Sequence, residues 1–362
     1  MPVAAFMGPL AARQLREIII PGSHDAGLAR AHQRDLFFGS SPAVTVTQSV
    51  DVAGQATGGS RFFDVRIQNI GGTLTSFHTA PNPLGQIPLI NKLKATKTDT
   101  RTLGASGQGF HDILNGLRGF VAGNPTEFVI VRLSHLKDSA EIFQQLWDWI
   151  RDPANDPFVY KGVGNLATKT VGDLARHVVL VIESKKFKHA VQPPGGGPRR
   201  IPDQSDGFHK FFQSKGGNLP SVNDGLCVCG EFSNKKTLDD ILKKQITNYS
   251  HHDQHKDQIG AHAHLYSLYW TATGGDIHAN TQQQLSPNFD RVRKLVKDKI
   301  QDNWAADLSA NKHQLLTRYR QENLARTKFA VKSASIPNII LYDFINDTTS
   351  QNIISLNDIV AA

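Results

Sequence analysis

The sequence predicts an α/β fold, a (β/α)8 barrel of the TIM type, regular or locally distorted, with loop insertions. Short apolar, β-branched runs recur along the 362-residue chain, and most read as strands of a parallel sheet buried on both faces. Helix-like segments lie between several runs, and this alternation is typical of α/β architectures. We expect eight strands, at residues 17–21, 62–68, 73–77, 127–133, 178–183, 226–232, 265–271 and 338–344.

The segments between these runs divide into helices and insertions. Residues 188–219 are rich in Pro, Gly and Lys and read as a long loop, and residues 249–264 form a polar, histidine-rich insertion. We expect one catalytic domain over residues 1–362, with its core at about 15–348. The expected helices lie at residues 109–121, 140–150, 238–247 and 288–299, with a short closing helix within 350–362.

One feature resists a regular barrel. Gly71 and Gly72 separate the second and third runs, and such a pair is typical of a tight hairpin turn. A hairpin centred there places His78 opposite Val65, and the third run is then an excursion from the barrel mouth rather than a barrel strand. Either geometry brings His78 close to Arg66.

Composition limits the class of partner. The formal net charge of +8 favours anionic partners such as lipid surfaces, nucleic acid or phosphate-bearing substrates, with simple solubility as the alternative. Cys227 and Cys229 lie two apart on a predicted strand, where a disulfide between them is unfavourable, so we expect packed thiols. We see no classical signal peptide and no apolar run of the roughly 20 residues that a membrane span needs, and localisation stays open between the cytoplasm and leaderless export.

Polar residues collect where the predicted strands end. In a barrel of this kind the active site is built at the C-terminal ends of the strands, and a buried strand has no other use for groups that are costly to bury. For Arg132, Glu183 and Glu231 the alternative is a structural ion-pair network inside the barrel. The residues at these ends are His24, Asp25, Asp64, Arg66, His78, Arg132, Ser134, Glu183, Glu231 and Asp343.

This set contains the groups needed to cleave a phosphodiester without a metal. Two histidines can serve as base and acid in one reaction, because an ordinary imidazole titrates near neutral pH. A guanidinium, here Arg66, is a permanently charged fork that matches a phosphate. The sequence therefore predicts phosphodiester chemistry at the barrel mouth.

Several motifs resemble the phosphatidylinositol-specific phospholipase C family. The run IIPGSHDAG at residues 19–27 resembles its first catalytic motif, and RFFDVR at 61–66 resembles its second. SFHT at 76–79 is similar to the segment with the second catalytic histidine. NPTEFVIV at 124–131 and NIILYDFI at 338–345 resemble later parts of the family's barrel, so the resemblance spans nearly the whole chain.

The resemblance also implies that the reaction uses neither a metal nor another cofactor. Calcium-dependent members carry Asn after the first histidine and an acidic residue two positions after the equivalent of Asp64, and these oxygens ligate the ion. This chain has Asp25 and Arg66 at those positions, as in the bacterial, metal-independent branch.

The implied reaction is phospholipase C-type cleavage of a phosphatidylinositol-like phosphodiester to diacylglycerol and a cyclic phosphate. His24 is the expected general base for a hydroxyl next to the phosphate, and His78 is the expected acid for the leaving alkoxide. Arg66 is expected to stabilise charge on the non-bridging oxygens.

Carboxylates are expected to support these groups. By resemblance, Asp343 orients His24 and stabilises its positive charge, and Asp25 does the same for His78. Asp64 is expected to fix the guanidinium or to join the acid network.

Substrate recognition departs from the family pattern. At the strand ends that hold the inositol ring in bacterial members, only the acidic Glu231 is similar in kind, and Tyr269 and Trp270 can stack on a ring. The headgroup is therefore open, and a phosphodiesterase for another headgroup or a lipid- or phosphate-binding module with little activity are the alternatives. The expected substrate-binding residues are Arg132, Ser134, Glu183, Glu231, Tyr269 and Trp270.

The expected partner is a phospholipid at a membrane surface, bound peripherally by a monomer. A nucleic-acid phosphodiesterase rests on basic charge alone, without a recognisable motif. Basic pairs at 185–186, 199–200 and 235–236 either dock an anionic bilayer or are solvated loop charges. His251 and His255 have the i, i+4 spacing of a metal pair, but we favour a polar surface insertion.

Overall fold

The structure is a computed structural model. The residues that it describes are 3–30, 32–33, 46–70, 72–79, 104–136, 139–193, 195, 197–214, 222–232, 240, 244–245, 247–248, 263–271 and 337–360.

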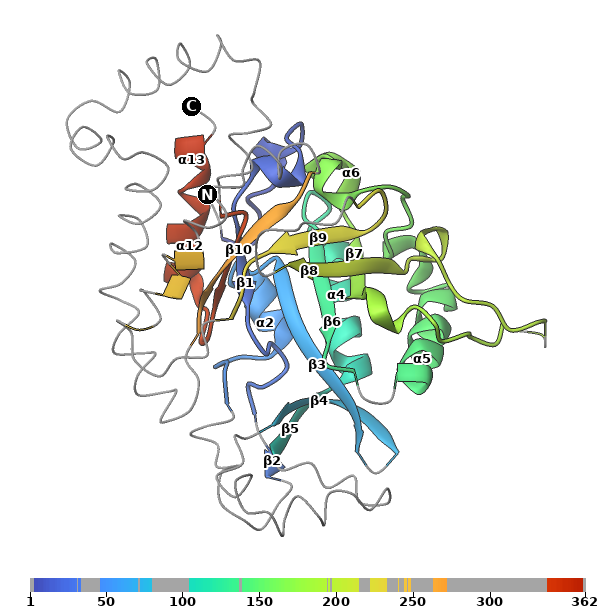
Figure 1. Ribbon diagram of the computed structural model, residues 1–362. Helices are drawn as coiled ribbons and strands as arrows, with labels where there is room; N and C mark the ends of the chain where they lie inside the picture. Colours follow the sequence, from blue (N-terminus) through green and yellow to red (C-terminus); the bar gives the residue numbers. More distant parts are fainter. Residues whose placement is uncertain are drawn as a thin grey trace, which may run out of the picture.

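Eight parallel strands close on themselves as a barrel, which confirms the predicted fold class (Figure 1). Each strand pairs in parallel with the next around the ring, and the last strand pairs with the first. In ring order the strands are β1 (Ile20–Ser23), β3 (Phe62–Ile70), β6 (Val129–Ser134), β7 (Val178–Glu183), β8 (His209–Ser214), β9 (Leu226–Cys229), β10 (Leu265–Trp270) and β11 (Ile339–Tyr342).

The third predicted run is not a barrel strand. It forms β4 (Thr73–Thr79), which is antiparallel to β3 and continues into β5 (Gly104–Gly109) and β2 (His32–Gln33) as a sheet at the barrel mouth (Figure 1). The hairpin alternative is therefore confirmed, because Ile67 pairs with Ser76 in the register that leads to His78 opposite Val65.

The eighth barrel strand was missed, because the prediction that residues 188–219 form one long loop is wrong at its end. Residues 209–214 form β8, between β7 and β9. This strand carries polar residues instead of a continuous apolar run, and the partners of these residues come from other segments of the chain. Lys210 Nζ, for example, donates to Asp224 Oδ2 at 2.8 Å.

The predicted helices at 109–121 and 140–150 are confirmed as α4 (Phe110–Gly123) and α5 (Ser139–Arg151). The closing segment forms two short helices. The prediction at 288–299, most of that at 238–247, and His251 and His255 lie outside the described residues. No helix within the described ranges is long and apolar enough to cross a membrane. The remaining helices are η1 (Gly8–Leu10), η2 (Leu15–Glu17), α2 (Val52–Thr57), η3 (Asp156–Phe158), η4 (Leu166–Thr168), α6 (Val171–Leu174), η5 (Ser184–Lys186), η6 (Gln204–Asp206), α12 (Asp347–Ile354) and α13 (Asn357–Val360).

Alternation along the strands divides the core in two. Successive side chains of a strand point to opposite faces, so Phe62 and Ile130 pack inside the barrel while Phe63 and Val129 pack outside with α4 and α5. The inward face changes character along each strand. On β3 it runs from Phe62 to Asp64, apolar at the start and polar toward the mouth. This gradient positions the candidate site.

Cys227 and Cys229 are buried and free, as predicted. Burial raises the pKa of each thiol to about 12. Both are therefore protonated, inert packing groups at neutral pH.

Candidate active site

The first and last barrel strands bring His24 and Asp343 together. Ser23 pairs with Tyr342 in the parallel register, so the residues that follow them emerge side by side at the mouth. His24 Nδ1 lies 2.9 Å from Asp343 Oδ1, and both side chains are buried. A carboxylate at Nδ1 fixes the imidazole so that Nε2 faces the other groups of the site.

Gln48 holds these two strand ends in place. Its fully buried amide donates to the carbonyl oxygens of His24 at 2.8 Å and Tyr342 at 3.1 Å, and its Oε1 accepts from the backbone N–H of Ile345 at 3.1 Å. Gln48 was not predicted, because a lone glutamine between elements carries no recognisable signal in the sequence.

Asp25 is the hub of the site. Its Oδ1 lies 2.6 Å from Arg66 Nε, and its Oδ2 lies 3.3 Å from His78 Nε2 and 3.5 Å from His24 Nε2. The Asp25 backbone has a φ of 43°, a left-handed conformation that is uncommon outside glycine and clusters at functional sites. One carboxylate thus contacts both imidazoles and the guanidinium.

Arg66 is the most exposed of the three groups that contact Asp25. Its Nη2 is 3.4 Å from His24 Nε2, and its side chain is 19% exposed, whereas that of Asp25 is fully buried. The guanidinium thus combines a partly exposed positive charge with a direct contact to the His24 ring. The Nδ1 atom of His78 has no hydrogen-bond partner within the described parts of the chain.

Asp64 is held by its neighbour strand rather than by direct contact with Arg66. The parallel register pairs Asp64 with Arg132, and Asp64 Oδ1 accepts from Ser134 Oγ at 2.8 Å and lies 3.7 Å from Arg132 Nη1. Burial alone raises the pKa of Asp64, but Arg132 and Arg66 outweigh it and lower that pKa to about 2. Asp64 is therefore an ionised group beneath the cluster.

Arg132 is a second buried cation in the barrel. It donates to Tyr269 Oη at 3.1 Å and to Gln213 Oε1 at 2.8 Å, and its guanidinium lies over the Phe211 ring at 4.5 Å. Burial lowers the pKa of Arg132, but Asp64 and Tyr269 outweigh it, so the pKa is raised overall. The predicted residues Arg132 and Tyr269 thus form the floor of the site.

The two histidines experience opposite pKa shifts. Burial lowers the pKa of His24, but the carboxylates of Asp25 and Asp343 outweigh it and the pKa is raised. Burial also lowers the pKa of His78, Asp25 opposes this, and Arg66 and His24 lower it further, so the pKa stays lowered. The site therefore provides one imidazole that binds a proton readily and one that releases it readily.

Phe232 was not predicted, yet it packs on the expected base. Its ring is stacked on that of His24, with centroids 5.2 Å apart and planes 15° apart, and it meets Tyr269 edge-on at 6.2 Å. With the carboxylate at Nδ1, this contact restrains the tilt of the imidazole. The side chain of Trp270, the other predicted stacking residue, lies outside the described set.

Two predicted residues lie apart from the cluster. Glu183 Oε2 is 3.3 Å from Lys185 Nζ, and Glu231 Oε2 is 3.3 Å from Lys244 Nζ. Among the described residues no direct ion pair joins Arg132 to Glu183 or Glu231, although the Glu183 carboxylate contributes to the raised pKa of Arg132.

A group with metal-ligand geometry exists within the site. Ligand atoms of His24, Asp25 and Asp64 lie within 4.8 Å of one another. However, the cation that contacts Asp25 is the guanidinium of Arg66, at 2.6 Å. A permanent charge thus already occupies the position beside this carboxylate, and the residues present favour phosphate binding over metal binding.

Together, the fold and the cluster define a (β/α)8 barrel protein with acid–base groups and a fixed cation at its mouth. Its fold is that of bacterial phosphatidylinositol-specific phospholipases C. The structure is similar to that of the phosphatidylinositol-specific phospholipase C from Listeria monocytogenes. The TM-score is 0.53 and the sequence identity is 14%, with 98% of this chain and 98% of that chain covered. It is also similar to the phosphatidylinositol-specific phospholipase C from Staphylococcus aureus, in a structure that addresses the membrane binding of that enzyme. The TM-score is 0.55 and the identity is 14%, with 98% of this chain and 97% of that chain covered. At this identity the similarity establishes the fold alone, and no protein-family model or curated protein sequence matches the chain.

Proposed function

We propose that this protein is a metal-independent phosphodiesterase of the phospholipase C type. Its substrate is a phosphatidylinositol-like lipid, and its products are diacylglycerol and a cyclic phosphate. The observation that carries the proposal is the contact of one carboxylate, Asp25, with His24, His78 and Arg66 at 2.6 to 3.5 Å. A binding module has no need of two imidazoles joined in this way.

Each group has a role in the proposed reaction. His24 takes the proton of a headgroup hydroxyl adjacent to the phosphate, and that oxygen attacks phosphorus. The bond from phosphorus to the glycerol oxygen breaks, and His78 gives its proton to the leaving alkoxide. The attack is intramolecular, so much of the entropic cost is already met. Arg66 stabilises the negative charge that develops on the non-bridging oxygens.

Metal independence follows from the charge already present. Arg66 provides beside Asp25 the positive charge that an ion would supply. The fold shared with bacterial phospholipases C, one of them a structure concerned with membrane binding, supports action at a membrane surface by peripheral contact.

Phosphorus NMR tests the reaction directly. Phosphatidylinositol vesicles incubated with the protein in EDTA are expected to give a cyclic phosphate signal. His78→Ala removes the acid, so we expect the initial rate to fall by about 10² to 10⁴. His111→Ala is the matched control, because His111 is exposed on α4 and contacts Gln145, away from the cluster.

Three results contradict parts or all of the proposal. A signal that appears only after a divalent cation is added contradicts metal independence. Equal rates for the wild-type protein and His78→Ala contradict the role of the histidine pair. If neither inositol lipids nor a panel of other headgroups is cleaved by the folded protein, the phosphodiesterase proposal itself is rejected.

A further inference from the structure

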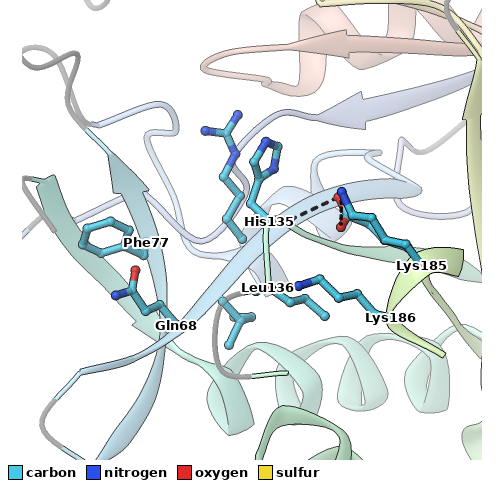
Figure 2. Close-up of a pocket in the computed structure, with 9 residues that line it drawn as sticks. Gln68, Phe77, His135, Leu136, Lys185 and Lys186 are labelled. Atoms are coloured by element: carbon cyan, nitrogen blue, oxygen red, sulfur yellow. Dashed lines mark hydrogen bonds and ion pairs between the residues drawn. The ribbon is translucent and has the colours of Figure 1, made fainter. Parts of the chain in front are cut away.

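A cavity adjoins the catalytic cluster across Arg66. Its volume is about 310 Å³, within the lower range of small-molecule sites. Figure 2 shows Gln68 and Phe77 of the β3–β4 hairpin on one side, and Lys185 and Lys186 at the end of β7 on the other. Neither catalytic histidine lines the cavity, so it lies beside the reacting centre rather than at it.

Positive charge dominates the cavity wall. Three cations line it, Arg66, Lys185 and Lys186, against one carboxylate, Glu183. Glu183 is committed to Lys185, at 3.3 Å. Lys186 Nζ donates to the carbonyl oxygen of Leu136 at 2.6 Å, and no carboxylate in the described ranges pairs with it. An anion that enters the cavity therefore meets an ammonium group that no carboxylate of the described residues neutralises.

His135 directly follows β6 and forms the part of the cavity wall between the β3–β4 hairpin and the end of β7 (Figure 2). Its φ of 54° is left-handed, a conformation found at ligand sites more than elsewhere. Its backbone N–H donates to Glu183 Oε1 at 3.4 Å. Burial lowers the pKa of His135 and the Arg66 charge lowers it further, so the ring contributes hydrogen bonding rather than charge.

We propose that this cavity is a subsite for a second phosphate group, recognised chiefly by Lys186 and shared with the cluster through Arg66. The inference rests on the proposed function, because the scissile phosphate must lie between His24 and His78 and leaves the cavity for another anion. A phosphate monoester matches the excess of positive charge better than a neutral hydroxyl does. The group is either a phosphate on the headgroup of the substrate or a separate phosphate.

Calorimetric binding of two soluble probes tests the subsite without turnover. Inositol 1,4-bisphosphate is expected to bind the wild-type protein about tenfold more tightly than inositol 1-phosphate, as one added charge-assisted contact allows. Lys186→Met is expected to reduce this advantage to about twofold or less, whereas Lys186→Arg retains it. The matched control is Lys188→Met, an exposed lysine that does not line the cavity and is expected to leave the advantage unchanged.

Inorganic phosphate distinguishes the two sources of the group. It is titrated into protein saturated with inositol 1-phosphate. If inorganic phosphate binds to this complex and the binding requires Lys186, the cavity accepts a separate phosphate. If inorganic phosphate does not bind while the bisphosphate is still preferred, the second phosphate must be part of the headgroup. Either result supports the subsite.

Equal affinities of the two inositol phosphates for wild-type protein overturn the proposal, as does an advantage that survives in folded Lys186→Met. Failure of the proposed function looks different. A protein that prefers the bisphosphate through Lys186 but cleaves no diester retains the subsite and loses the enzymatic assignment. An active enzyme without this preference loses the subsite alone.

Discussion

Asp25 couples the charges of the site because it contacts both imidazoles and the guanidinium. The pKa of His24 is raised and that of His78 is lowered. Above the pKa of His24 both rings are neutral and no acid remains. Below the pKa of His78 both are protonated and no base remains. Activity is therefore expected between the two, when one proton is shared by the pair and the fraction with that proton on His78 reacts.

Replacing Asp343 with Asn tests this account. The pKa of His24 is influenced most by the burial of its ring, then by Asp25 and then by Asp343. Because the Asp343 carboxylate raises this pKa, replacing it with a neutral amide is expected to lower the pKa of His24. The alkaline limb of kcat/KM against pH follows the ring with the higher pKa and is expected to move to lower pH. An Asn also fails to hold the Nδ1–H tautomer, so kcat/KM is expected to fall by roughly 10² to 10⁴.

The pH profile of Asp343→Asn is read against Asp347→Asn, an exposed carboxylate at the start of α12. That control is expected to match the wild-type profile. An alkaline limb that stays in place in Asp343→Asn contradicts the assignment of that limb to His24.

The residues of the cluster differ in how visible they are in the sequence. His24, Arg66 and Asp343 were found because polar residues at strand ends are conspicuous against apolar runs. Gln48 and Phe232 were not found. A glutamine that bonds backbone groups and a phenylalanine that stacks on an imidazole are ordinary residue types, and only the tertiary structure gives them a role.

At the scale of elements, β8 shows why strand prediction failed at one position. The other barrel strands are recognisable as apolar runs, but β8 begins with His209, which is fully buried. His209 Nε2 lies 3.0 Å from the carbonyl oxygen of Tyr160, and Nδ1 lies 3.3 Å from Gln204 Nε2. The Gln204 oxygen accepts from the Gly164 N–H, so its amide group donates to Nδ1 and the ring is neutral. These hydrogen bonds between distant segments leave no local pattern.

The buried, neutral His209 predicts acid sensitivity of the fold. Burial lowers its pKa to about 4, against about 6.5 in an unfolded chain. Between these values the unfolded chain binds a proton that the folded protein does not, so stability falls as the pH falls from about 6.5 to about 4, by up to roughly 3 kcal/mol. Urea unfolding at several pH values measures this slope.

The His209→Gln variant isolates the contribution, because Gln can still donate to Tyr160 and does not titrate. It is expected to be less stable at pH 7, with a shallower fall in unfolding free energy toward pH 4. Parallel curves for the two proteins would falsify the assignment to His209.

At the scale of the whole molecule, the two ends of the barrel serve different purposes. The candidate site lies at the C-terminal ends of the strands, where the polar residues of the sequence gather. The N-terminal ends hold a separate ion pair, Arg61 with Glu127, whose side chains are both fully buried and whose Nη2 and Oε2 atoms are 2.6 Å apart. Arg61 lies between the rings of Phe6 and Phe120, and Glu127 Oε1 accepts from the backbone N–H of Met7. This pair fastens the N-terminal segment across the barrel floor.

Glu127→Gln should separate stability from chemistry. The substitution leaves the Arg61 charge buried without compensation, so the free energy of unfolding is expected to fall by about 3 to 5 kcal/mol. The double variant Arg61→Met with Glu127→Leu should recover most of this loss, because it removes both charges. Asp148→Asn, at an exposed position on α5, is the control and is expected to change stability by less than about 0.5 kcal/mol.

Since the pair lies at the end of the barrel opposite the cluster, Glu127→Gln should leave activity unchanged. At temperatures well below its unfolding midpoint, the kcat/KM of the folded variant should equal that of the wild-type protein. A variant that keeps its stability but loses activity would show instead that the floor of the barrel sets the geometry of its mouth.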